Sequence, residues 1–160
     1  MNARVSALDR RCRPVATAIM PVTLHELLEG FLWADARGEA EYRAYICRQT
    51  GKIYYYTDYD SGELEEPLPD DIDDREKYLQ IPDKYGLDLG KPLVLDFAHE
   101  HLPDDYDEIR DIFSRRRAYQ KFRSLLARRG AIDRWHAFEN KATEQALREW
   151  CRLHGLEIAD

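Results

Sequence analysis

The stretch that decides the fold is Ser114 to Gly155, which reads SRRRAYQKFRSLLARRGAIDRWHAFENKATEQALREWCRLHG. Its apolar residues recur every three or four positions on both sides of a central glycine, which is the spacing of amphipathic helices that bury one face. We expect Ser114 to cap a helix that runs to Arg129. A second helix, capped by Asp133, should run to His154 and stop at Gly155. The chain is therefore predicted to end in two amphipathic helices.

Aromatic residues mark the buried face of both predicted helices, because residues three or four positions apart share a helix face. The core stripe of the first helix comprises Tyr119, Phe122, Leu125 and Leu126, and that of the second comprises Trp135, Phe138, Ala142, Ala146, Trp150 and Leu153. If Trp150 lies in the core, its replacement by alanine should lower the free energy of unfolding by roughly 3 to 5 kcal/mol.

Upstream of the helices, two short runs rich in aromatic and β-branched residues predict a β-hairpin. They are residues 42–48 and 52–57, and the loop between them ends in Gly51, which can adopt the positive φ that a three-residue loop needs. Residues 77–81 predict a third strand that Pro82 ends.

Helix signals surround the predicted strands. Thr23 and Glu26 form a capping box that opens a helix ending near Gly38, and a second helix should span Pro92 to about His101. Pro103 begins another short helix. The predicted fold class is α+β: a small antiparallel sheet, made of the hairpin and the third strand, packed with a C-terminal bundle of amphipathic helices.

The chain of 160 residues is long enough for one domain with a sizeable core. Residues 1–19 lack sustained periodicity, so we expect them to be a flexible N-terminal extension. The single α+β domain should occupy residues 20–160.

Composition excludes two protein classes. Charged residues make up 34% and apolar residues 44% of the chain, and the mean hydropathy is -0.67, which fits neither a membrane protein nor a wholly disordered one. The three cysteines, Cys12, Cys47 and Cys151, are too far apart to indicate a disulfide framework or a zinc site. No secretory signal follows the basic first residues, so we expect a cytoplasmic protein.

Charge is segregated along the chain. Residues 58–109 carry 4 basic and 18 acidic side chains, whereas residues 110–160 carry 12 basic and 7 acidic ones. Such a distribution indicates either a surface that binds a partner or two parts of the chain that attract each other. We favour the second interpretation.

A basic cluster in the first of the two C-terminal helices is the feature with the clearest binding chemistry. Arginines along one helix face can follow nucleic-acid phosphates, and a nearby tyrosine can stack on bases. The candidate residues are Arg115, Arg116, Arg117, Lys121 and Arg128, with Tyr119, and Arg123 and Arg129 lie beside them. The isoelectric point of about 5.3 argues against a dedicated nucleic-acid domain, and these arginines are more readily explained by solvation or by the acidic middle of the chain.

We expect no metal site. An EF-hand that began at Asp58 would need glycine at its sixth position and glutamate at its twelfth, whereas Gly62 is fifth and Pro69 is twelfth. His99 and His101 would lie about 200° apart on a helix and would not share an ion. We interpret His101 as packed beside Phe97, and His99 as exposed to solvent.

No catalytic residue and no cofactor are predicted either, because the chain has no nucleophile elbow and no glycine-rich phosphate-binding pattern. An enzyme would need a pocket between the tyrosine-rich hairpin and the helices, where Tyr55, His136 and Glu139 are the candidate residues. Glu139 lies in the apolar stripe of the last helix, so it needs either an ion pair, for example with Arg123, or a raised pKa.

Turn residues and core aromatics follow one another at a recognisable order and spacing. They are Thr50-Gly51, Ile81-Pro82, Asp96-Phe97, Phe122, Trp135, Phe138, Trp150 and Gly155. This pattern resembles that of Uncharacterised Protein Family 0158, a set of small bacterial proteins. The resemblance covers about residues 20–157, and it implies the fold and a bacterial origin but no activity, cofactor or catalytic residue.

These observations favour a non-enzymatic module that binds an unidentified protein partner through exposed tyrosines and a charge-segregated surface, because aromatic residues with arginines are typical of interface cores. The alternative is a nucleic-acid-associated protein that uses the basic helix after Ser114, and an enzyme is the third interpretation. No membrane partner is expected, and the sequence leaves the oligomeric state open.

Overall fold

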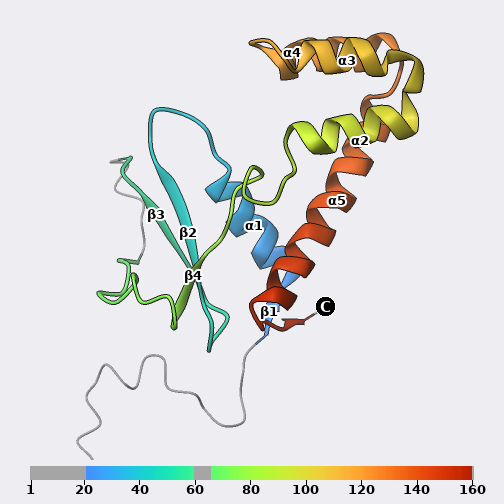
Figure 1. Cartoon of the computed structure of the whole chain (residues 1–160). Coiled ribbons are helices and arrows are strands. Elements are labelled where there is room, and N and C mark those ends of the chain that lie inside the picture. Colours follow the sequence, from blue (N-terminus) through green and yellow to red (C-terminus); the bar gives the residue numbers. More distant parts are fainter. Residues whose placement is uncertain (1–20, 60–65, 160) are drawn as a thin grey trace, which may run out of the picture. The chain divides into compact units, whose positions relative to one another are not determined.

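The structure is a computed structural model that describes residues 21–59 and 66–159 (Figure 1). The described residues contain several helices and a small antiparallel sheet, so the predicted α+β class is confirmed. The chain divides into two compact units, which we describe separately. The sheet unit extends to Asp83 and resumes at Leu147, and the helical unit is Lys84–Ala146. The expectation of one domain over residues 20–160 stays a prediction, and the expected flexible extension, residues 1–19, lies outside the described residues.

The predicted hairpin and third strand form the three-stranded sheet of the sheet unit. The strands are β2 (Tyr42–Cys47), β3 (Ile53–Thr57) and β4 (Tyr78–Gln80), in the order β3-β2-β4. Both pairings are antiparallel, with Tyr45 opposite Tyr54 on one side and Gln80 on the other. Gly51 has a φ of 74°, as the hairpin loop requires. The sheet therefore has β2 at its centre and β3 at one edge.

Helix α1 (Leu24–Ala34) covers one face of this sheet. Thr23 caps it with the predicted capping box, in which Oγ1 accepts from the N–H of Glu26 at 3.1 Å. Gly30 lets the helix approach closely, because a Cβ atom there would lie 2.7 Å from Cδ1 of Ile81. The helix ends at Ala34, earlier than the expected stop near Gly38.

A second pair of strands was not predicted from the sequence. Strand β1 (Val22–Thr23) lies parallel to β5 (Ile158–Ala159), with Val22 opposite Ile158. Two-residue strands are too short to show alternating hydrophobicity, so no periodic pattern predicts them. This pair joins the two ends of the described chain within the sheet unit.

The helical unit has a core of packed aromatic side chains. Phe97 lies at its centre, with ring centroids 6.4 Å from Phe122, 5.2 Å from Trp135 and 5.4 Å from Phe138. The elements that supply and surround this core are α2 (Lys91–His101), the 3-10 helix η1 (Pro103–Asp105), α3 (Tyr106–Ile112), α4 (Ala118–Arg128) and the first part of α5 (Ile132–Leu153). The predicted aromatic core is therefore present here.

Two predicted helix starts are wrong. Ser114 does not cap α4, because its hydroxyl donates instead to the carbonyl of Asp111 at 2.6 Å and a turn follows. The helix begins at Ala118 after Arg117, whose φ of 59° breaks the helical path. Asp133 lies inside the first turn of α5, since that helix begins at Ile132.

The core stripe predicted for the last helix is wrong at its C-terminal end. Leu153 is 67% exposed and Trp150 is only half-buried, whereas Leu147 and Cys151 are buried. At about 100° per residue, these two buried residues lie roughly 120° to 160° around the helix from Trp135. The physical reason is that α5 belongs to both units and buries a different face in each.

Candidate functional site

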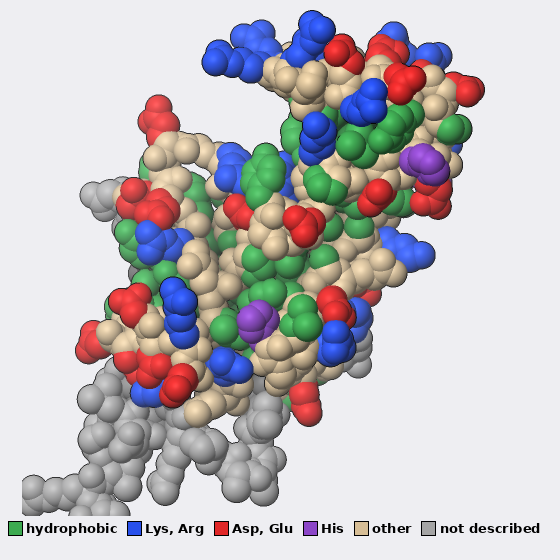
Figure 2. All heavy atoms as spheres, viewed as in Figure 1, with side chains coloured by type: hydrophobic (Ala, Val, Ile, Leu, Met, Phe, Trp, Pro, Cys, Tyr) green, Lys and Arg blue, Asp and Glu red, His purple; other side chains and the backbone are tan. Residues whose placement is uncertain are grey.

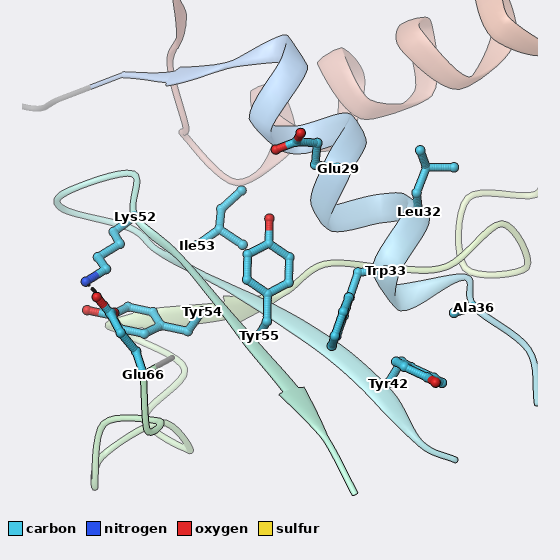
Figure 3. Close-up of a pocket in the computed structure, with 10 residues that line it drawn as sticks. All are labelled: Glu29, Leu32, Trp33, Ala36, Tyr42, Lys52, Ile53, Tyr54, Tyr55 and Glu66. Atoms are coloured by element: carbon cyan, nitrogen blue, oxygen red, sulfur yellow. Dashed lines mark ion pairs between the residues drawn. The ribbon is translucent and has the colours of Figure 1, made fainter. Parts of the chain in front are cut away.

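A groove of about 940 Å³ opens in the sheet unit between α1 and β3 (Figure 3). Its volume lies in the range of ligand-binding sites. The helix contributes Glu29, Leu32, Trp33 and Ala36, the hairpin contributes Tyr42, Lys52, Ile53, Tyr54 and Tyr55, and Glu66 completes the lining. Because Tyr54 and Tyr55 are successive residues of one strand, they point to opposite faces of the sheet. The groove therefore wraps around the outer edge of β3.

Trp33 forms the central wall of the groove. Its ring stands between those of Tyr42 and Tyr55 (Figure 3), with centroid distances of 5.2 and 5.4 Å and interplanar angles of 85° and 73°. Its indole Nε1 donates to the carbonyl of Tyr56 at 3.0 Å. Edge-to-face contacts and this hydrogen bond hold the aromatic wall rigid.

One end of the groove is charged. Lys52 Nζ lies 2.7 Å from Oε2 of Glu66 and 5.0 Å from the centroid of the Tyr54 ring. The hydrogen bond that Lys52 donates to Glu66 raises the pKa of Lys52, so the ammonium stays charged at neutral pH. This end presents a cation on an aromatic surface.

The hydroxyl of Tyr55 points toward Glu29 of α1 (Figure 3). Burial raises the pKa of Tyr55, and the carboxylates of Glu29 and Glu26 raise it further. The phenol is therefore protonated at neutral pH and acts as a hydrogen-bond donor.

The backbone of β3 adds hydrogen-bonding groups to this site. The ladder to β2 is fixed at its two ends, where the N–H of Cys47 donates to the carbonyl of Lys52 at 2.8 Å and the N–H of Asp58 donates to that of Glu41 at 3.3 Å. Hydrogen-bonded positions alternate in an antiparallel pair, so Tyr54 and Tyr56 bond to β2. The peptide groups of Ile53, Tyr55 and Thr57 consequently face the outer edge, on which no other described strand pairs.

The basic cluster predicted from the sequence lies in the helical unit, where side chains of Lys and Arg gather over α4 (Figure 2). Several of its arginines have acidic partners. Arg129 binds Asp105, and single ion pairs of 3.5 Å join Arg128 to Glu108 and Arg115 to Asp111.

The rest of the cluster is more open. Arg116, Arg117 and Lys121 are exposed, and none of them forms an ion pair with a residue in the described ranges. Tyr119, which was expected to stack on bases, has Lys84 Nζ 4.2 Å from its ring centroid and Phe113 at 5.0 Å. One surface of the tyrosine is thus already used by the protein itself.

The comparison with known families found a match that spans most of the chain. The model of the uncharacterised protein family UPF0158 matches residues 18–159, which covers both units. The chain belongs to UPF0158. No curated protein and no solved structure matches the chain.

The UPF0158 chain distributes the three candidate pocket residues between its units. Tyr55 lines the groove of the sheet unit. His136 is exposed on the part of α5 that belongs to the helical unit, and Glu139 is half-buried there, with its carbonyl accepting from Thr143 Oγ1 at 2.8 Å. A pocket in which all three converge stays a prediction.

The histidine and acidic motifs are the remaining candidates for metal ligands. His101 stacks on Phe97 at a centroid distance of 4.9 Å and His99 is exposed, as expected. Within residues 21–59 and 66–159, no group of three or more His, Cys, Asp or Glu side chains is placed to hold a metal ion. Gly62 of the EF-hand comparison lies outside the described residues. None of the described helices combines the length and the apolar character needed to span a membrane.

Of the residues that line the groove, the sequence analysis named only Tyr55 as a candidate, and it missed the wall that α1 contributes. Trp33, Leu32 and Glu29 come from α1, for which the sequence analysis predicted a helix but no site residue. One signal was available in the sequence. The apolar pair Leu32-Trp33 makes the apolar face of this helix wider than a single buried face requires.

Proposed function

We propose that this UPF0158 chain is a protein-interaction module whose sheet unit binds an extended segment of a protein partner as an added strand along β3. The outward peptide groups of Ile53, Tyr55 and Thr57 carry this proposal. Strand addition obtains its affinity from main-chain hydrogen bonds to such an edge and its selectivity from pockets for alternate side chains.

The groove supplies those pockets on both sides of the edge. One set of side chains of an added strand would reach the surface of Trp33, Tyr55 and Leu32, and the alternate set would reach Tyr54 and Lys52. Leu32 is 66% exposed beside the aromatic wall, and a partner that covered it would remove apolar surface from water. Tyrosine and tryptophan are the residues that most often dominate binding energy at interfaces.

Peptides selected from a random library of unstructured decapeptides provide the test. Peptides that use this site should lose about tenfold or more in affinity for the Leu32→Asp variant, because aspartate places a charge on the apolar wall. Leu153→Asp is the matched control, since Leu153 is equally exposed but lies on α5. Bound peptide should also slow hydrogen exchange at the amides of Tyr55 and Thr57. Equal binding to both variants, without this protection, would overturn the proposal.

A second candidate function is favoured by the exposed side chains of Arg116, Arg117 and Lys121 on the helical unit. They suit a nucleic-acid phosphate backbone, whose binding weakens as salt rises. The test is binding of single-stranded RNA and duplex DNA to a variant with alanine at residues 115–117, with Arg134→Ala/Lys141→Ala as control. This function is supported if binding weakens as salt rises, and weakens in the variant at residues 115–117 but not in the control. The absence of binding at low salt would overturn it.

A further inference from the structure

The edge strand and its two flanking residues are chemically self-complementary. Residues 52–58 read KIYYYTD, so a basic residue begins the segment, an acidic residue ends it, and Tyr55 lies at the centre. When two copies of this segment run antiparallel about Tyr55, Lys52 of each lies opposite Asp58 of the other. The intervening pairs are Ile53 with Thr57 and Tyr54 with Tyr56.

The alternation of inward and outward peptide groups along β3 suits this arrangement. The peptide groups of Tyr55 face the outer edge, so Tyr55 opposite its own copy would exchange two N–H···O=C bonds across a two-fold axis. The Ile53–Thr57 pairs would be hydrogen-bonded in the same way. The Tyr54–Tyr56 and Lys52–Asp58 pairs then occupy the non-hydrogen-bonded positions, where side chains approach most closely.

We propose that the segment that adds to β3 is β3 of a second copy of this chain, which makes one continuous six-stranded sheet from two sheet units. This inference rests on the proposed strand addition and names its partner. The charge pattern favours a second copy over an unrelated segment, because each copy supplies both the cation and the anion that the other requires.

The charged side chains retain bonding capacity for this contact. Lys52 binds Glu66 at 2.7 Å, and its ammonium has two further N–H groups. Asp58 accepts the N–H of Glu41 through Oδ1 at 2.6 Å, which leaves Oδ2 to receive a cation.

The apolar surface beside the edge gives independent support. A two-fold axis normal to the joined sheet places both copies of α1 on the same face. Leu32 of each copy, 66% exposed, would then lie beside the seam instead of facing water. Closing two edges against each other also removes the hazard that an open edge strand presents.

The test is a pair of complementary charge variants of the full chain, studied by sedimentation over a concentration series. In Lys52→Glu, two glutamates face two aspartates across the seam, and in Asp58→Lys, lysines face lysines. We expect each variant alone to raise the dimer dissociation constant by about tenfold or more. When the two are mixed, every pair across the seam is again opposite in sign, so heterodimers should form with near-native affinity.

The outcomes separate this inference from the proposed function. The Lys141→Glu variant controls for net charge, since Lys141 is exposed on α5, and it should dimerise as the native chain does. A native chain that stays monomeric, or a dimer that both charge variants leave unchanged, would overturn the second-copy proposal. Selected peptides that still bind beside Leu32 in that case would preserve strand addition to another partner, whereas their failure would end both.

Discussion

Arg129 holds Asp105 with two parallel hydrogen bonds, from Nε to Oδ2 at 3.1 Å and from Nη2 to Oδ1 at 2.9 Å. Asp105 is only 8% exposed, and donating these hydrogen bonds to its carboxylate raises the pKa of Arg129. The contact joins the end of α4 to the residue before α3, so an arginine from the basic end of the chain here satisfies an acid from its middle. For this pair, the interpretation that the acidic and basic parts of the chain attract each other is confirmed.

Replacing Asp105 should therefore destabilise the helical unit. Asp105→Ala removes a bidentate pair whose acid is buried, whereas Glu108→Ala removes a single exposed contact of 3.5 Å to Arg128. We expect the first variant to lower the melting temperature clearly and the second to change it little, with Asp105→Asn in between. Equal shifts for the two alanine variants, measured by circular dichroism, would show that the bidentate geometry adds nothing.

Local signals were sufficient where one short segment decides its own structure. The capping box at Thr23 and the glycine turn at Gly51 each place an element at its observed position. Long-range choices were not readable in the same way. Helix α5 shows one apolar stripe, but which residues it buries near Cys151 depends on the sheet unit, to which that end of the helix belongs.

The groove is a further case in which the sequence supplies the residues but not their arrangement. Alternation along β3 predicts that tyrosines point to both faces, whereas nothing local says that Trp33 stands between Tyr42 and Tyr55. That contact depends on how closely α1 approaches the sheet at Gly30. Pairing of side chains across elements is a tertiary property, and periodicity reports only which face is apolar.

Two tryptophans of α5 should differ in their contribution to stability. Trp135 is 6% exposed and packs on Phe97 and Phe122, at centroid distances of 5.2 and 5.1 Å, so Trp135→Ala should cost about 3 to 5 kcal/mol. Trp150 is half-buried and its ring lies 5.1 Å from that of His154, so Trp150→Ala should cost roughly half as much or less. Urea unfolding of both variants checks the order, and a larger loss for Trp150→Ala would mean that the buried face of α5 is misassigned.

The two cysteines among the described residues, Cys47 and Cys151, should react slowly with thiol reagents in the folded protein. Cys47 and Cys151 are both buried, and burial raises the pKa of the Cys151 thiol to about 11. The thiolate is the reactive species, so little of it is present at pH 8. In a Cys12→Ser variant, a disulfide reagent at pH 8 should label both thiols at once in guanidinium chloride and only slowly in buffer. Rapid labelling in buffer would show that one of these sites opens readily.

Acid should weaken the segment that leads into β4 through Asp71. Lys77 Nζ lies 2.9 Å from Oδ2 of Asp71, and Tyr78 Oη donates to Oδ1 at 3.3 Å. The hydrogen bond from Lys77 lowers the pKa of Asp71 below its ordinary value. The folded state thus favours the ionised carboxylate, and its stabilisation is complete well above the ordinary aspartate pKa of about 4 and is lost as the pH falls toward the lowered value.

The contribution should be about 1 kcal/mol or less, because the pair is partly exposed to water. Comparing Asp71→Asn with the native chain isolates it: the native chain should be more stable at pH 6, and the difference should shrink steadily between about pH 5 and pH 3. Asp73→Asn is a suitable control, since Asp73 is exposed in the same segment and should leave the pH dependence unchanged. A difference between native and Asp71→Asn that stays constant down to pH 3 would mean that Lys77 does not bind this carboxylate in solution.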